Sequence, residues 1–307
     1  MMLRKRPRTR AFGDEVRTAI PATERKRPLM RWVLGALFLL LLAALLVGTL
    51  GPLLFLAKSA VSPTQDTLRD PLAWFPSGQF LWENIPYVWG KLRIGHYLGN
   101  TAIMSFGAAI FSVLVAGSGA YVLSVIRPRW GRFVEGLLLI TLFVPGIVSL
   151  VPLYLTIIKM PVVGLSLFNT FWAVWLPAGA NAFNVLLVKR MMDGLPGELF
   201  EAAEIDGASH LRVMWSIAFP LTRPILGVVA LLSLVAAWKD YLWPMLVLQS
   251  PDVQPLNVAL PLMSENIELN FFMAALFIAV IIPVALFLVF QRQFLNGVAS
   301  SSGISAS

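Results

Sequence analysis

Residues 197–220 (GELFEAAEIDGASHLRVMWSIAFP) concentrate side chains that can do acid–base or ionic chemistry. Three glutamates, an aspartate, a histidine and an arginine occur there, between long apolar runs on both sides. Carboxylates of this kind can exchange protons with a substrate or meet a complementary surface of another protein. No carboxylate pair here has a convincing catalytic partner, which favours binding over catalysis.

The common catalytic and nucleotide-binding motifs are absent from the sequence. The pair Gly90-Lys91 lacks both the upstream glycine and the following Ser/Thr of a GxxxxGK[ST] loop. HExxH and GxSxG are absent, cysteine is absent, and the two histidines, His96 and His210, are far apart in the sequence. We therefore predict no enzyme activity, no bound cofactor and no metal site on this chain.

Composition indicates that the elements around this segment lie in a membrane. The 307 residues are 58% hydrophobic and 13% charged, with a mean hydropathy of +0.77, whereas soluble domains carry about 25% charged residues. A spanning helix needs about 20 apolar residues. The uncharged runs predict an all-α membrane protein with six transmembrane helices, at about 33–57, 97–126, 134–158, 168–190, 222–248 and 269–292.

The basic residues predict the orientation of these helices. Ten of the 24 Lys and Arg residues precede residue 32; with the N-terminus inside, 18 fall in inner segments and 5 in outer ones. Such a bias places both termini in the cytoplasm, and residues 197–220 on the cytoplasmic side between helices four and five. A signal peptide is the competing interpretation, but the run 32–57 is longer than its core of about 7–15 residues.

Three parts are expected along the chain. Residues 1–31 form a basic cytoplasmic tail that suits anionic lipid better than nucleic acid. Residues 32–297 form the six-helix transmembrane domain. Residues 298–307 are disordered by composition.

Local signals predict a helix–glycine–helix within the acidic segment. Glu198 to Asp206 are good helix formers, and Gly207 suits a left-handed helix end. Ser209 can cap a second helix that reaches about Trp215, and Pro220 is expected to end the segment. Such a unit fits a groove on a partner protein; an interfacial linker with a solvated charged face is the alternative.

Polar residues inside the predicted spans are candidates for a transport route. Residues 177–179 (Pro-Ala-Gly) interrupt the fourth run, and Asn181 and Asn184 follow on one helical face, with amides that suit hydroxyl-rich substrates. Hydrogen bonding between helices is the alternative role for both. Lys239 and Asp240 lie either in an outer aromatic belt or near an outer gate.

One motif in the acidic segment resembles a known family signature. EAA, three residues, Gly, nine residues, Ile, two residues and Pro form the cytoplasmic-loop signature of ABC importer permeases, and Asp206 before the glycine resembles the carbohydrate branch. The matching residues are Glu201, Ala202, Ala203, Gly207, Ile217 and Pro220. Further stretches, among them WKDYLWP and FQRQFLNG, extend the resemblance to about 97–297, which is similar to the second, six-helix permease of maltose-type importers.

The resemblance implies a pore subunit of an ATP-driven sugar importer in a bacterial inner membrane. Its partners would be a second homologous permease, an ATP-binding cassette ATPase dimer that binds ATP and Mg, and an extracytoplasmic solute-binding protein. The segment with Glu201 would be the coupling helix that docks on the ATPase. An ATP-independent transporter using Lys239 or Asp240, and a membrane scaffold that binds a partner through 197–217, remain alternatives.

Two departures from the family pattern stand out. Phe219 occupies a position where the family usually has Leu, and Lys239-Asp240 stand where it usually has an Asn-containing pair. The sugar itself is not predicted by the sequence.

Overall fold

The computed structural model describes residues 28–301, except 72, 74, 77 and 162–163, and this part of the chain contains helices and no strands. The all-α prediction is confirmed. The helices are α1 (Pro28–Ala60), α2 (Thr64–Arg69), α3 (Asn84–Gly90), α4 (Ile94–Tyr121), η2 (Val122–Ile126), α5 (Gly131–Thr141), α6 (Gly146–Ile158), α7 (Trp172–Gly179), α8 (Ala182–Asp193), α9 (Glu198–Ile205), α10 (His210–Val213), η3 (Met214–Ala218), α11 (Phe219–Leu221), α12 (Arg223–Lys239), α13 (Leu242–Val247), α14 (Leu256–Ser264) and α15 (Leu269–Ser301).

The chain divides into two units, Met1–Leu54 and Phe55–Ser307. In the first unit the described part is α1 up to Leu54, whose apolar side chains are exposed all around the helix, with Phe38 and Leu40 each 65% exposed. A helix that is apolar on every face suits a lipid environment. Most of the predicted basic tail, 1–31, lies outside the described residues.

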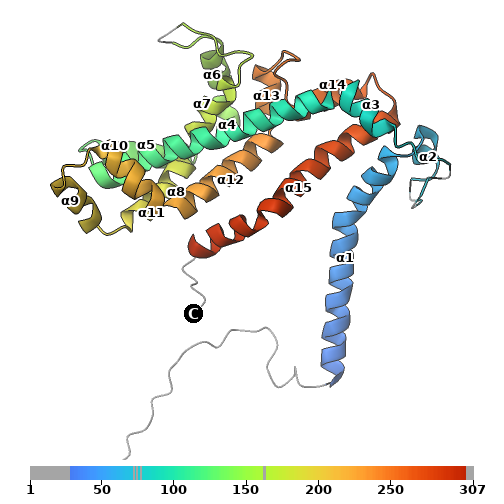
Figure 1. Cartoon of the computed structure of the whole chain (residues 1–307), viewed down its shortest axis with the longest axis horizontal. Coiled ribbons are helices and arrows are strands. Elements are labelled where there is room, and N and C mark those ends of the chain that lie inside the picture. The colour runs from blue at the N-terminus through green and yellow to red at the C-terminus, as the bar shows by residue number, and fades with distance from the viewer. Residues whose placement is uncertain (1–27, 72, 74, 77, 162–163, 302–307) are drawn as a thin grey trace, which may run out of the picture. The chain divides into compact units, whose positions relative to one another are not determined.

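Helix α4 is the central element of the second unit. Together with η2 it forms a span from Ile94 to Ile126 that is long and apolar enough to cross a membrane. It contacts α7, α8 and α12, and Figure 1 shows α12 running alongside it. Gly107 allows the closest of these approaches: an added Cβ would lie 2.1 Å from the indole of Trp175 on α7, whose Nε1 donates a hydrogen bond to the Met104 carbonyl at 3.0 Å.

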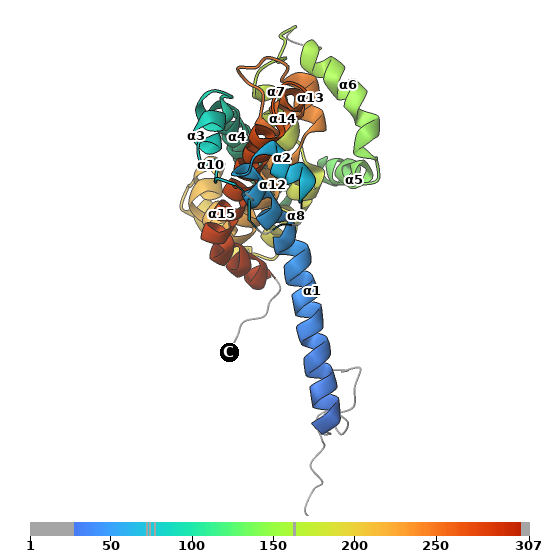
Figure 2. The ribbon, with the colours of Figure 1, turned by 90° about the vertical axis from the view of Figure 1, so that its right-hand side faces the viewer.

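Three of the predicted spans are pairs of helices rather than single ones. The run 134–158 is divided into α5 and α6, which are bent by 112° at a break before Gly146 (Figure 2). The run 168–190 breaks after Gly179, and the run 222–248 breaks at Asp240. The length of an uncharged run identifies an apolar segment but does not locate a break in the helix, because loop residues and helix residues can be equally apolar.

By length and composition, two described helices, α1 and α4 with η2, could each cross a membrane. The number of described spans rises to four if two bent pairs, Gly131–Thr141 with Gly146–Ile158 and His210–Leu221 with Arg223–Lys239, each count as one. The count of six therefore stays a prediction. Helix α15 continues to Ser301, into the segment 298–307 that composition predicts to be disordered. Residues 302–307 lie outside the described residues.

Candidate functional site

The acidic segment folds as α9, a glycine turn and α10. Helix α9 ends in a Schellman motif, in which the amide of Ala208 donates to the Ala203 carbonyl and that of Gly207 to the Glu204 carbonyl, both at 3.0 Å. Gly207 has φ +73°, the left-handed conformation that glycine adopts without strain. The predicted helix and its glycine end are confirmed.

The second half of the segment differs in part from the prediction. The Ser209 hydroxyl accepts a hydrogen bond from the Arg212 amide at 3.4 Å and caps α10, as predicted. Helix α10 passes directly into the π-helical turn η3 and then α11. This continuous helical stretch ends at Leu221, one residue after Pro220, so Pro220 lies next to the end of the segment rather than at it.

The motif residues divide between a buried and an exposed face. Ala203 is buried and Ile217 is half-buried, and both contact the apolar core of this end of the molecule. Glu201, Ala202 and Asp206 are exposed. The buried residues hold the unit to the core, while the exposed ones present a surface with acidic and small side chains.

Sequence reasoning missed two residues of that exposed surface. Ile205 is 87% exposed and Leu211 is 70% exposed, on either side of the Gly207 turn. Both side chains are large and apolar, so the exposed surface around the turn is apolar as well as acidic. The sequence could have indicated their exposure, because this Ile and this Leu stand beside charged residues and neither shares a helical face with the buried Ala203.

A cavity of about 310 Å³ lies beside the turn. It is lined by Ala203, Asp206, Ala208, Arg212, Val213, Ser216 and Ile217. The structure therefore brings three of the predicted motif residues, Ala203 of α9, Asp206 of the turn and Ile217 of η3, to one cavity.

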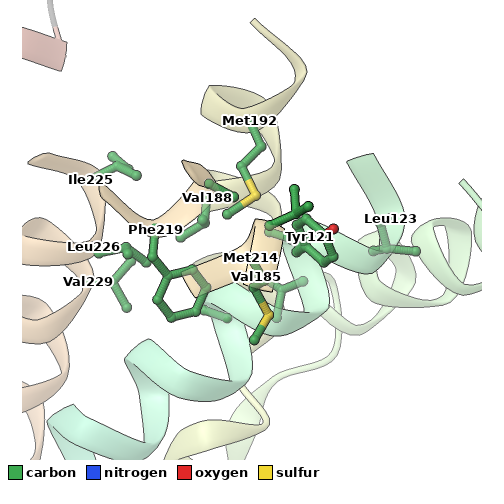
Figure 3. Packing of buried hydrophobic residues seen from close by; sticks show 14 of the residues in the cluster. Tyr121, Leu123, Val185, Val188, Met192, Met214, Phe219, Ile225, Leu226 and Val229 are labelled. Carbon is green, nitrogen blue, oxygen red and sulfur yellow. The ribbon is translucent and has the colours of Figure 1, made fainter. Parts of the chain in front are cut away.

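Phe219 fixes the far end of the segment to α4. Its ring contacts Trp215, with ring centroids 4.7 Å apart, and an added Cβ on Gly117 would lie 2.6 Å from its Cζ atom. Figure 3 shows Phe219 grouped with Leu226 and Val229 of α12, beside a second group that contains Met214 and Val185. The larger side chain at this position is thus matched by a glycine on α4.

Charged residues join α5 to α8 near the same end. The Lys189 ammonium lies 3.2 Å from a Glu135 carboxylate oxygen and 2.8 Å from one of Asp193. Burial alone would raise the pKa of Asp193, but hydrogen bonds from Lys189 and Ser124, and the positive charges of Lys189 and Arg127, hold that pKa below its ordinary value. Asp193 is therefore ionised near neutral pH.

The predicted route residues are only partly brought together. Asn181 caps α8 by accepting a hydrogen bond from the Asn184 amide at 3.1 Å, and it lines a second cavity, of about 270 Å³, together with Asp240. Asn184 is buried and donates to the Ser233 hydroxyl at 3.1 Å, a hydrogen bond between α8 and α12. Lys239 is exposed and is not among the lining residues.

The fold defines a class of protein, a helical membrane protein, and this one carries an exposed acidic helical unit. The sequence of residues 108–299 matches the family described as the binding-protein-dependent transport system inner membrane component. The chain belongs to this family. It is accordingly a multi-pass plasma-membrane protein and an ABC transporter permease.

Curated relatives cover most of the chain. It is 29% identical over 276 residues to the arabinooligosaccharides transport system permease protein AraQ of Halalkalibacterium halodurans, covering 88% of this chain and 95% of the relative. It is 28% identical to the sn-glycerol-3-phosphate transport system permease protein UgpE of Yersinia enterocolitica, covering 84% and 94%. It is 29% identical to the melibiose/raffinose/stachyose import permease protein MelC of Bacillus subtilis, covering 75% and 83%.

A solved structure has the same fold. A chain of a bacterial ABC transporter involved in the import of the acidic polysaccharide alginate superposes with a TM-score of 0.75 at 19% identity, covering 89% of this chain and 98% of that one. The relatives named above are transport permease subunits rather than enzymes.

Proposed function

We propose that this chain forms half of the pore of an ATP-driven importer for a sugar or oligosaccharide, and that α9 is its coupling helix. The observation behind the proposal is the exposed unit of α9, Gly207 and α10, whose Ala203 and Ile217 are held in the core. Permease relatives for arabinooligosaccharides and for melibiose, raffinose and stachyose support the substrate class.

The assembly we propose contains three further components. A second, homologous permease completes the pore, and a solute-binding protein delivers the substrate from outside. An ATPase dimer holds ATP and Mg, and its closure pushes α9; this chain binds no nucleotide itself. The family description, which names a binding-protein-dependent system, supports this arrangement.

Charge reversal at Glu201 tests the docking role. Glu201 is exposed in the first turn of α9, so Glu201→Lys alters the docking surface without disturbing the core. We expect the variant to insert into the membrane at the normal level but to lose the ATPase on co-purification and to lose ATP-dependent uptake. Glu265→Lys, an exposed charge reversal after α14, is the matched control and should behave as wild type.

Normal ATPase binding and uptake by Glu201→Lys would show that α9 is not the docking element. The same preparations separate the rival functions. Uptake that survives ATP depletion but stops when the proton gradient is collapsed would indicate an ATP-independent transporter. A chain that retains a cytoplasmic partner but transports nothing would indicate a scaffold.

A further inference from the structure

The cavity of about 270 Å³ lies where two helix breaks meet. Ala178 at the end of α7 and Asn181 in the α7–α8 break line it, together with Ala237 at the end of α12 and Asp240 just after that helix. Ser112 of α4 and Trp243 of α13 also line the cavity. Irregular backbone at membrane depth is tolerated where it is covered by protein or lines an aqueous cavity, and residues at both of these breaks line this cavity.

The lining combines polar groups that both donate and accept hydrogen bonds with apolar side chains. The Ser112 hydroxyl donates to the Ala178 carbonyl at 2.9 Å, which leaves its oxygen lone pairs able to accept. The Ser233 hydroxyl accepts from Asn184, which leaves its proton able to donate. Leu153 and Val174 supply apolar surface. Hydroxyl-rich molecules with apolar ring faces need such a mixed wall.

Trp243 is positioned rigidly at this wall. Its indole Nε1 donates to the Ala173 carbonyl at 3.0 Å, across to α7. That bond fixes the ring and uses its one polar hydrogen, so the ring can offer the cavity only aromatic surface.

Among the described residues that line the cavity, Asp240 is the one ionisable residue. Its Oδ1 accepts a hydrogen bond from the Trp243 amide at 3.4 Å, and the neighbouring Lys239 is exposed outside the lining. An anionic substrate would meet a carboxylate here and find no cation among the lining side chains. An uncharged substrate would meet an additional hydrogen-bond acceptor instead.

We propose that this cavity binds an uncharged sugar unit and that Asp240 makes it unfavourable for anionic sugars or sugar phosphates. The proposal deepens the importer function proposed above and rests on it. The proposal also separates this chain from some of the proteins to which it is similar. Those proteins are involved in the transport of neutral oligosaccharides, of sn-glycerol 3-phosphate and of an acidic polysaccharide. The proposal predicts substrates of the neutral-oligosaccharide kind for this chain.

The absence of cysteine from the sequence allows a direct test. Ala236→Cys places one thiol at the cavity, and Ser166→Cys, in an exposed loop, is the control for free solution. Both are made in the full chain and purified with whatever partners accompany it. Each thiol is then reacted at neutral pH and low salt with a cationic trimethylammonium-ethyl or an anionic sulfonato-ethyl methanethiosulfonate.

We expect the ratio of cationic to anionic reaction rates in Ala236→Cys to exceed that in Ser166→Cys by about tenfold, because a charged cavity concentrates counter-ions to that degree or more. Adding Asp240→Asn to Ala236→Cys keeps an oxygen acceptor for the Trp243 amide and removes the charge, so it should bring the ratio close to the control. A mixed panel of uncharged mono- to tetrasaccharides that includes raffinose should slow the reaction of the cavity thiol, while sn-glycerol 3-phosphate should not.

An unchanged rate ratio when Asp240→Asn is added, or a complete lack of protection by the uncharged panel, overturns the proposal. Protection by sn-glycerol 3-phosphate that equals that of the sugars overturns it as well. These rates need neither ATP nor transport, so they are independent of the outcome of the Glu201→Lys experiment. Loss of the importer function and loss of the sugar site are therefore distinguishable.

Discussion

At the scale of single residues, Phe219 and Gly117 form a matched pair. The ring of Phe219 occupies the space in which a side chain at position 117 would lie, 2.6 Å from the added Cβ. Gly117→Ala should lower the unfolding free energy by about 1–3 kcal/mol through overpacking. Combining it with Phe219→Leu, which frees that space, should cost less than the sum of the two single variants.

Thermal unfolding of the four proteins in detergent measures this coupling. Gly99→Ala is the matched control, because Gly99 lies in the same helix and an added Cβ there meets nothing within 4 Å. It should be neutral or stabilising, since alanine favours a helix over glycine. Strict additivity of the Gly117 and Phe219 variants would show that the two residues do not share this space.

The second residue-scale prediction concerns Gly207. Its φ of +73° is strained for any residue with a Cβ, although nothing lies within 4 Å of the position. Gly207→Ala should therefore cost about 1 kcal/mol through backbone strain alone and loosen the end of α9. Faster proteolysis of the turn in the folded protein would detect this loosening.

Gly197→Ala is the control for that experiment. Gly197 precedes the same helix with φ −61°, a conformation open to any residue, and it also has free space around it. Equal proteolysis rates for the two variants would contradict the strain argument.

Local sequence signals predicted some residues of the site well and others poorly. Gly207 and Ser209 act through their own backbone neighbours, so their roles in turn and cap could be inferred from spacing. Asn181 and Asn184 share a helical face in the sequence, yet one lines a cavity while the other binds Ser233 of α12. That distinction depends on a distant helix and could not be inferred from local spacing.

At the scale of elements, Lys189 joins α5 to α8. Its ammonium group is close to the carboxylates of both Glu135 and Asp193. Lys189→Met would leave these two carboxylates without their shared cation, so the variant should unfold at a lower temperature. The corresponding loss of unfolding free energy should be about 1 kcal/mol or less, because the pairs are partly exposed.

Arg190→Met, at the next position on α8 and exposed, is the control and should leave the unfolding temperature unchanged. The difference between the variants should shrink at high salt, because salt screens exposed charges. If the decrease in unfolding temperature of Lys189→Met does not depend on salt, the alkyl chain of Lys189 stabilises the protein through packing rather than through its charge.

Apolar runs predicted where helices occur but not where they break. The break between α5 and α6 falls at residues 142–145, just before the helix that Pro145 caps, and the one between α7 and α8 falls at Ala180, where Asn181 begins a new helix. The Pro-Ala-Gly interruption at 177–179 did indicate the second break, although Pro177 itself lies inside α7. Proline is compatible with the first turn of a helix as well as with a loop, so its presence alone does not locate a break.

At the scale of the whole molecule, the distribution of basic residues predicts which ends face the cytoplasm. Single cysteines in this cysteine-free sequence test that prediction. Glu198→Cys at the start of α9 and Ser264→Cys at the end of α14 both alter exposed positions. A membrane-impermeant maleimide should label Ser264→Cys in intact cells, and Glu198→Cys only after the membrane is opened.

The reverse labelling pattern would show that the orientation is inverted, and labelling of both variants in intact cells would contradict an odd number of spans between the two positions.

Composition predicted the helical membrane class and the motif predicted the family, because both depend on residue types alone. The two cavities were not predicted, since each is formed by helices that are distant in sequence.

The packing of Phe219 against Gly117 has a consequence for the connection between α9 and α12. The stretch His210–Leu221 meets Arg223–Lys239 at an angle of 82°, and Phe219, which packs against Gly117, lies close to this corner. Helix α12 is a rod of 17 residues, about 25 Å long at 1.5 Å per residue, and Asp240 lies at its far end. If α9 docks on the ATPase as proposed, a displacement of α9 would reach Asp240 through α10, α11 and α12, because one continuous stretch of chain connects the proposed docking helix to the lining of the cavity.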